Sequence, residues 1–205
     1  MCDASPRKGA RRRISIMTKI AIVYYSGYGH TAKQAEAVLE GAASVASAKL
    51  YRIDQNGDLP ESVFEALSEA DAIIYGSPTY MGGPAWQFKK FADASSKPWF
   101  GQAWKNKVAA GFTNSASVNG DKFSTISYFI TLAMQHSQIW VGTGLMPSNT
   151  KAHGPDDVNW TAGFGGALAV SPSDASPEEA PRKGDLETAR LLGVRVAEFA
   201  KKLKG

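Results

Sequence analysis

The sequence contains almost no cysteine and no long apolar run. Its single cysteine, Cys2, cannot form a disulfide within the chain. A chain without internal disulfides fits a reducing compartment, so we expect a cytoplasmic protein. No apolar run approaches the roughly 20 residues that a membrane-spanning helix needs. With 205 residues, of which 43% are hydrophobic, the composition favours a globular domain over a disordered or membrane-spanning chain.

Histidine is also scarce, with three residues in the chain: His30, His136 and His153. None belongs to a cluster of His, Cys, Asp and Glu with the spacing of metal ligands, so we expect no metal site. No Ser-His-acid arrangement can be recognised either, which argues against acyl transfer.

An excess of one charge is absent from most of the chain, although the formal net charge is +4. Residues 1–16 carry five basic residues against one acid, Asp3. Without this segment, 23 basic and 19 acidic residues become 18 of each. We therefore predict a disordered basic extension over 1–16 and one neutral folded domain over 17–205. A nucleic-acid partner is not expected for the folded part.

Short apolar, β-rich runs alternate with helical patterns from Lys19 onward. This alternation predicts right-handed βαβ units and an α/β fold with a doubly wound parallel sheet. About 40 residues rich in Gly, Pro, Ser and Asp, 145–183, are predicted as a long loop. The predicted strands are 19–25, 48–53, 71–76, 107–113 and 138–143, and the predicted helices are 30–45, 59–70, 84–95, 122–136 and 185–204.

The segment "SGYGHT" (26–31) directly follows the first predicted strand and enters a helix. Such a turn presents unpaired N–H groups at the positive end of a helix dipole, which suits a phosphate. Ser26 and Thr31 can add hydroxyl donors, and Gly27 and Gly29 allow the backbone to curl around an anion. The segment has neither the lysine of a P-loop nor the GxGxxG spacing. It is equally compatible with a simple capped strand–helix turn.

Two further loops follow the third and fourth predicted strands. The segment "GSPTYMGGPAW" (76–86) offers a rigid turn, flat or polarizable side chains and two glycines, which suits a planar ring. The segment "TNSASVNGDK" (113–122) is small and polar and can wrap the edge of a heterocycle. Ligands of parallel sheets bind beyond the carboxyl ends of the strands. The three loops together therefore predict a mononucleotide site.

These residues resemble the WrbA-type NAD(P)H:quinone oxidoreductases, a flavodoxin-like family. The resemblance covers about 19–204 and is most specific at "YYSGYGHT" (24–31). It extends through "GSPTYMGGPAWQFKKFAD" (76–93), Pro98-Trp99, "TLAMQHSQIWVGTG" (131–144) and "ETARLLGVRVAEFAKKL" (187–203). It implies a flavodoxin-like five-stranded sheet of order 2-1-3-4-5 with helices on both faces, and FMN as cofactor.

The resemblance also assigns site residues. It places the FMN phosphate at 26–31, the flavin ring and ribityl chain at 78–83 and the pyrimidine side of the ring at 115–120. Tyr28 would lie where nicotinamide or quinone stacks, Trp99 would form a wall of the substrate pocket, and His136 would lie close to the flavin. The implied FMN-binding residues are Ser26, Gly27, Tyr28, Gly29, His30, Thr31, Pro78, Thr79, Tyr80, Met81, Gly82, Gly83, Thr113, Asn114, Ser115, Ala116, Ser117, Gly120 and His136.

The implied function is two-electron hydride transfer from NADH or NADPH to a quinone or similar planar acceptor, by a ping-pong mechanism. The resemblance also implies a homodimer or homotetramer, with the 145–183 loop over the substrate or in a subunit interface. A flavodoxin-type electron carrier and an NAD(P)H-dependent FMN reductase or azoreductase stay open as alternatives. Carriers of that kind are usually strongly acidic, whereas residues 17–205 are neutral.

Overall fold

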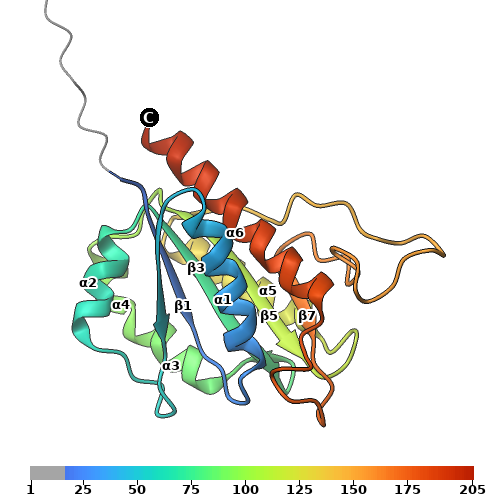
Figure 1. Cartoon of the computed structure of the whole chain (residues 1–205). Coiled ribbons are helices and arrows are strands. Elements are labelled where there is room, and N and C mark those ends of the chain that lie inside the picture. The colour runs from blue at the N-terminus through green and yellow to red at the C-terminus, as the bar shows by residue number, and fades with distance from the viewer. Residues whose placement is uncertain (1–16) are drawn as a thin grey trace, which may run out of the picture.

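The computed structural model describes residues 17–205, and the predicted basic extension 1–16 lies outside the described residues. Its centre is a sheet in the order β2-β1-β3-β5-β6, in which all neighbouring strands are parallel (Figure 1). The five predicted strands are these five, so the predicted order is confirmed. Two further strands pair at the carboxyl end of the sheet: β4 with β3, and β7 with β5. The strands are β1 Lys19–Tyr24, β2 Ser47–Arg52, β3 Ala72–Tyr80, β4 Gly83–Pro84, β5 Val108–Ser115, β6 Ile139–Trp140 and β7 Ala167–Val170.

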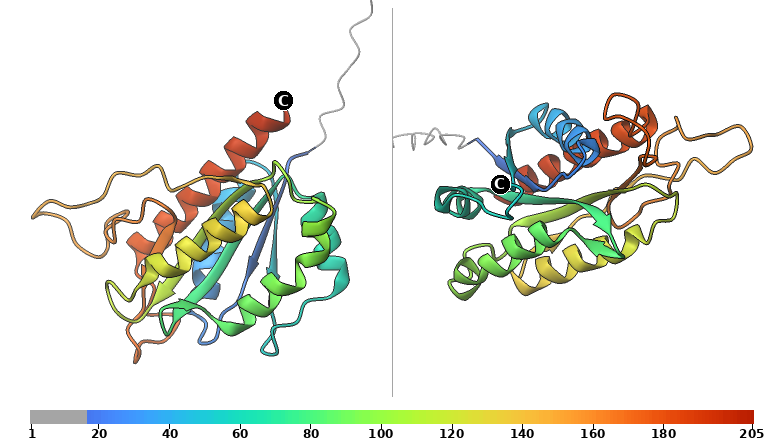
Figure 2. Two further views of the ribbon diagram at one scale, coloured as in Figure 1. Left: turned by 180° about the vertical axis from the view of Figure 1, so that it is seen from behind. Right: turned by 90° about the horizontal axis from the view of Figure 1, so that it is seen from below.

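Helices cover both faces of the sheet (Figure 2). Successive side chains of a strand point to opposite faces, so each central strand contributes to two cores. In β1, Ala21 and Val23 join the core under α2, α3 and α5, whereas Ile20 and Ile22 join the core under α1 and α6. The helices are α1 His30–Ala43, α2 Glu61–Glu69, α3 Trp86–Ala94, α4 Ser96–Phe100, α5 Lys122–Gln135 and α6 Lys183–Lys204.

The fifth predicted strand, 138–143, was predicted too long. Only Ile139 and Trp140 pair, and they pair with the first two residues of β5. The backbone N–H of Thr143 instead bonds to the carbonyl of Phe164, because the returning chain crosses there. β7 then takes the place beside the second half of β5. The predicted loop 145–183 therefore contains a strand, and its first part projects away from the sheet (Figures 1 and 2).

Two of the predicted loops begin inside strands. β3 continues through Ser77 to Tyr80, and a hairpin with Met81 and Gly82 at its turn leads into β4. β5 continues through Ser115. The hydroxyl and small residues at the ends of β3 and β5 have the composition of a loop. The two strands nevertheless pair with each other as far as Pro78 in β3 and Asn114 in β5. Trp99, predicted outside the regular elements, lies in α4.

None of the helices within 17–205 is long and apolar enough to cross a membrane.

Candidate cofactor-binding site

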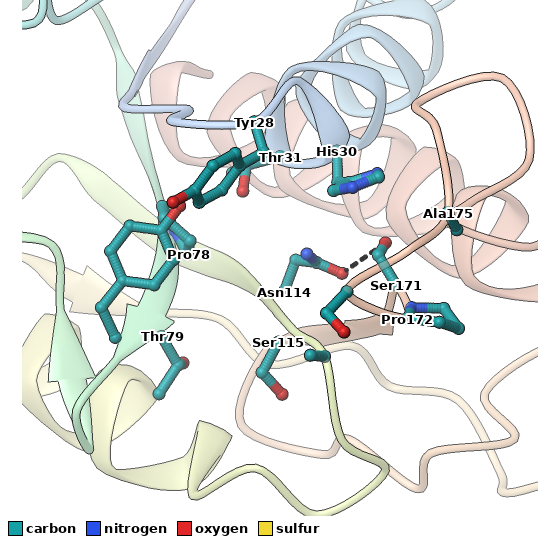
Figure 3. Close-up of a pocket in the computed structure, with 13 residues that line it drawn as sticks. Tyr28, His30, Thr31, Pro78, Thr79, Asn114, Ser115, Ser171, Pro172 and Ala175 are labelled. Carbon is teal, nitrogen blue, oxygen red and sulfur yellow. Dashed lines mark hydrogen bonds between the residues drawn. The ribbon is translucent and has the colours of Figure 1, made fainter.

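A cavity of about 500 Å³ opens at the carboxyl end of the sheet. Its volume lies in the range of small-molecule sites. Four chain segments form it: the β1–α1 loop, the β3 end, the β5 end and the segment after β7 (Figure 3). The lining residues are Tyr28, His30, Thr31, Pro78, Thr79, Tyr80, Asn114, Ser115, Ala116, Ser171, Pro172, Ser173 and Ala175.

Ser26 shapes the β1–α1 loop rather than lining the cavity. It is buried, and its Oγ accepts hydrogen bonds from the backbone N–H groups of Gly29 (3.2 Å) and Ala32 (3.1 Å). The next N–H groups of the first helical turn, those of His30 and Thr31, have no acceptor within residues 17–205. Unpaired N–H groups at a helix N-terminus attract an anion. The loop predicted to hold a phosphate therefore presents free donors beside the cavity.

Gly29 and His30 join this loop to the segment after β7. Gly29 has a φ of 95°, a conformation that L side chains rarely adopt, and a Cβ there would lie 2.6 Å from Cγ of Pro177. The Nδ1–H of His30 donates to the carbonyl of Ala180 at 2.9 Å. That bond leaves Nε2 of the His30 ring available at the cavity. Two segments 150 residues apart in the sequence thus meet beside the cavity.

Tyr28 and Tyr80 form an aromatic mouth. Their rings meet edge to face with centroids 6.2 Å apart, and Tyr28 is 77% exposed. The Tyr80 hydroxyl lies against Gly27, where a Cβ would approach it to 2.6 Å. Burial raises the pKa of Tyr80 to about 12, so this phenol stays neutral at physiological pH. Exposed Met81, with Gly82 and Gly83, continues the rim next to Tyr80 but does not line the cavity.

A chain of three buried threonine hydroxyls lies at the end of β3 and β5. Thr113 donates to the carbonyl of Ser77 at 2.7 Å, so its oxygen accepts from Thr79 at 2.8 Å. Thr79 in turn accepts from Thr125 at 2.8 Å. The protons of all three hydroxyls are thereby committed, one to the Ser77 carbonyl and two to threonine oxygens. Thr79 lines the cavity as an acceptor, and Thr113 supports it from below.

Asn114 offers a donor to the cavity. Its Oδ1 accepts a hydrogen bond from Oγ of Ser171 at 2.9 Å, and Figure 3 shows the two side chains meeting across the cavity. The amide Nδ2 has no partner within the described residues, although Asn114 is buried. An amide N–H of this kind can donate to a carbonyl or ring nitrogen of a ligand.

The loop after β5 is held from within by a buried lysine, Lys122. Its Nζ donates to Ser115 Oγ and to the carbonyls of Ser117 and Val118, at 2.7–2.8 Å. Ser115 and Ala116 line the cavity, whereas Ser117 and Gly120 lie further along this loop. Sequence reasoning missed Lys122. A lysine at the first position of a helix, against the helix dipole, is the signal that could have found it.

His136 and Trp99 are not brought to the cavity within one chain. α5 begins at the carboxyl end of the sheet and runs antiparallel to the strands, so His136, after its last turn, lies at the other end. Its Nε2–H donates to Ser95 Oγ (2.9 Å), its ring stacks on Trp104 and burial lowers its pKa to about 4. Trp99, in the short α4 that follows Ser95, is 47% exposed.

The segment Ser171–Ala175 was not among the predicted site residues. It enters the site because β7 pairs parallel with β5, which brings the end of β7 beside Ser115. The sequence carries a signal for it, since "ALAV" followed by "SPSDAS" repeats the pattern of an apolar strand and a small polar loop. The short strand was hidden in a segment rich in Gly and Pro.

The donor set fits a flavin mononucleotide. Free N–H groups at the start of α1 suit a phosphate, the Asn114 amide suits a heteroatom of the ring system, and apolar Tyr80 and Pro78 offer flat surface. Within residues 17–205, no group of three or more His, Cys, Asp and Glu side chains could hold a metal ion.

Comparison with known proteins agrees with this geometry. Residues 29–150 match the family described as NADPH-dependent FMN reductase. A curated relative from Pseudomonas aeruginosa, named "Flavodoxin FldP", is 49% identical over 187 residues, covering 91% of this chain and 99% of the relative. An "NAD(P)H dehydrogenase (quinone)" from Sinorhizobium fredii is 34% identical over 205 residues, again covering 91% and 99%.

A solved structure is also similar along almost the whole chain. The flavodoxin, WrbA-like protein from Agrobacterium tumefaciens is 49% identical with a TM-score of 0.73, covering 90% of this chain and 98% of that one. A flavodoxin from Archaea, at 19% identity and a TM-score of 0.61, shares the fold. Fold, cavity and relatives agree, and the chain belongs to the flavodoxin-like FMN family that includes the WrbA-like proteins.

Proposed function

We propose that this chain is an FMN-dependent NAD(P)H:quinone oxidoreductase that works by a ping-pong mechanism. The observation that carries the proposal is the cavity itself. It has free helix N-terminal donors at one end and an open, uncharged aromatic mouth at the other. The relatives named NAD(P)H dehydrogenase (quinone) support the choice of quinone as acceptor.

Three groups of residues would hold FMN. The N–H groups of His30 and Thr31 would bind the phosphate, the β3 end from Pro78 to Tyr80 would lie along the ring and ribityl chain, and Asn114 would donate to the ring edge. Loop 115–120 would cover the pyrimidine side. Bound FMN supplies the redox chemistry, because it accepts a hydride from a nicotinamide and passes two electrons on.

The protein's own part is placement. Tyr28 and Tyr80 present flat, uncharged surface at the mouth, against which a nicotinamide and then a quinone can stack in turn. Burial raises the pKa of Tyr80, so its hydroxyl stays in the neutral form even at alkaline pH. A single mouth used by two planar substrates in sequence gives ping-pong kinetics.

Initial-rate kinetics test this proposal. Protein loaded with FMN is assayed with NADH or NADPH at several fixed benzoquinone concentrations. Parallel double-reciprocal lines are expected, since each substrate must leave before the next one stacks. Intersecting lines would show that both substrates bind at once and would contradict a shared mouth.

A second function, that of an electron carrier, is favoured by the 49% identical relative named a flavodoxin. The two functions differ in one step. A carrier binds FMN but does not oxidise NAD(P)H by itself, whereas an oxidoreductase does. Bound FMN that is not reduced by either nicotinamide would therefore select the carrier. Reduction of added free FMN faster than of benzoquinone would select the FMN reductase that the family description names.

We further propose a homodimer or homotetramer and a cytoplasmic location. The exposed Trp99 and the projecting first part of the 145–183 segment are surfaces that a second copy could cover. Light scattering on FMN-loaded protein measures the assembly, and cell fractionation measures the location.

A further inference from the structure

Lys122 occupies a costly position for which the proposed reaction gives no reason. It is 1% exposed, and it is the first residue of α5, where the helix dipole disfavours a cation. Burial lowers its pKa to about 8, although the nearby carboxylate of Asp185 acts to raise that pKa. A buried ammonium must be hydrogen-bonded to be tolerated. Its partners therefore show what the residue is for.

Those partners all belong to one loop. Nζ of Lys122 donates to Ser115 Oγ (2.8 Å) and to the carbonyls of Ser117 (2.7 Å) and Val118 (2.8 Å), with the Asn119 carbonyl at 3.3 Å. An ammonium has three protons, so the three shorter bonds account for all of them. The carbonyls of successive residues therefore accept hydrogen bonds from one ammonium group, where the carbonyls of an exposed loop would accept them from water.

Gathering these carbonyls also orients the other side of the loop. In a planar trans peptide, the N–H points opposite to the preceding carbonyl. The N–H groups of Val118, Asn119 and Gly120 therefore point away from the ammonium. Within the described residues they have no acceptor. The loop is thus a row of free donors whose shape depends on an internal cation.

We propose that Lys122 is a positioning residue of the flavin pocket: it holds loop 115–120, before any cofactor binds, in the shape that lines the cavity. The loop supplies Ser115 and Ala116 to the cavity and carries the free N–H groups next to them. The cofactor half of this proposal rests on the FMN binding proposed above, whereas the loop half does not. Each half therefore has its own measurement.

The chain contains a matched control, Lys107. It is half-buried, where Lys122 is fully buried, but its pKa is likewise lowered by burial and its Nζ likewise donates to two carbonyls, those of Ser68 and Ala70. It lies just before β5, at the amino end of the sheet, away from the cavity. Lys122→Met and Lys107→Met thus remove the same kind of bond at opposite ends of one strand.

The loop half is tested by backbone ¹⁵N relaxation in the protein without FMN, because the N–H groups of this loop have no acceptor within the described residues and their order must be read from motion. In Lys122→Met the order parameters of residues 116–121 are expected to fall from about 0.85 to below about 0.6, whereas Lys107→Met is expected to leave that segment as in the wild type. Equal order parameters for 116–121 in the wild type and Lys122→Met would overturn the proposal. If Lys122→Met does not fold, Lys122→Gln, which keeps two donors without the charge, is measured against the same criterion.

The cofactor half is tested by titrating FMN and riboflavin by fluorescence quenching. Because Lys122 acts on the ring side, Lys122→Met is expected to weaken both ligands about ten-fold, while the ratio of their affinities stays constant. Unchanged affinities in Lys122→Met would overturn this half, as would a loss that Lys107→Met reproduces. A wild-type protein that binds neither flavin would contradict the proposed function, while the relaxation measurement would still decide the role of Lys122 in the loop.

Discussion

The two ends of the sheet differ in where their unpaired polar groups lie. At the amino end, Lys204 pairs with Asp71 at 2.7 Å and Lys19 pairs with Glu69 at 2.9 Å. At the carboxyl end, the backbone N–H groups of His30 and Thr31 and the Nδ2 of Asn114 have no partner within residues 17–205. Folding normally pairs its buried polar groups. The amino end, as far as the structure describes it, also has buried atoms without a partner, Nδ1 of His136 and Nε2 of Gln138. The free donors at the carboxyl end differ in that they lie beside a cavity of about 500 Å³, and this combination marks the end of the sheet that binds a ligand.

Each end nevertheless contains one lysine whose ammonium group donates to backbone carbonyls. Half-buried Lys107, before β5, and buried Lys122, after it, both donate to backbone carbonyls. At the amino end, the bonds of Lys107 tie the start of β5 to the end of α2. At the carboxyl end, the bonds of Lys122 shape a loop beside the cavity. The two lysines differ in their surroundings, since only the loop that Lys122 holds contributes residues to the cavity. Substitutions at the carboxyl end should therefore change FMN affinity, whereas those at the amino end should change only the stability of the fold.

The largest expected effect on binding is that of Gly29→Ala. A side chain at a φ of 95° costs about 1–3 kcal/mol, and its Cβ would collide with Pro177. We expect FMN affinity to fall about ten- to one-hundred-fold and riboflavin affinity to change much less, because the phosphate side is distorted. Quenching titrations measure both. Gly101→Ala, at an ordinary φ with no close contact, serves as control, and equal FMN affinities in the two variants would count against the phosphate loop.

The next effect is a pH dependence of stability at the carboxyl end. Burial raises the pKa of Asp185 to about 6, although the Val170 N–H donates to it. The folded protein therefore binds more protons than the unfolded chain between about pH 4 and 6, and this carboxyl lowers stability as pH rises through that window. Asp185→Asn removes that penalty. Relative to the wild type, the variant should gain about 1–2 kcal/mol between pH 4.5 and 7.

Urea unfolding at the two pH values measures this change. Asp156→Asn provides a control, because Arg182 holds the pKa of Asp156 below its usual value. Asp156 is then largely ionised in both the folded and the unfolded state throughout this window, so the stability difference between Asp156→Asn and the wild type should stay nearly constant between about pH 4.5 and 7. If the free energy of unfolding of Asp185→Asn differs from that of the wild type by the same amount at both pH values, then ionising Asp185 does not destabilise the folded protein.

A smaller effect on binding is expected for Asn114→Ala. Loss of one neutral hydrogen bond to the ligand is worth about 1 kcal/mol, or about five-fold in FMN affinity. Ser171→Ala removes the partner of Asn114 Oδ1 while keeping the free Nδ2, and it should affect affinity less. Isothermal titration calorimetry compares the two. The reverse order would assign the binding role to Ser171.

The smallest effect is expected at the amino end, for Lys204→Met. The Lys204–Asp71 pair is partly exposed, and such pairs contribute about 0–1 kcal/mol. Thermal unfolding should show a small loss, and FMN affinity should equal that of the wild type. Weaker FMN binding in this variant would remove the functional distinction between the two ends.

Much of this arrangement could be predicted from the sequence, because strong local patterns coincide with the fold. The apolar run 19–25 and the helical spacing after it define β1 and α1, and their junction forms the predicted turn. The sheet order agreed with the family resemblance. The ends of β3 and β5 were placed too early, because hydroxyl residues such as Thr79 and Thr113 pair in strands there despite their loop-like composition.

The remaining features depend on contacts between distant parts of the chain. β7 and the Ser171 segment enter the site through pairing with β5, more than 50 residues earlier in the sequence. The carbonyl ligands of Lys122 depend on the folded path of the loop, which composition does not determine. His136 resembles a family position near the flavin, but within one chain α5 carries it to the opposite end of the sheet.

The most direct test of the central claim is anaerobic mixing of FMN-loaded protein with NADH or NADPH while the visible absorbance of the flavin is followed. We predict one FMN per chain and rapid loss of this absorbance, followed by its return when benzoquinone is added. Failure to retain FMN would contradict the site at the carboxyl end of the sheet. Retained FMN that neither nicotinamide reduces would contradict the oxidoreductase function and leave an electron carrier.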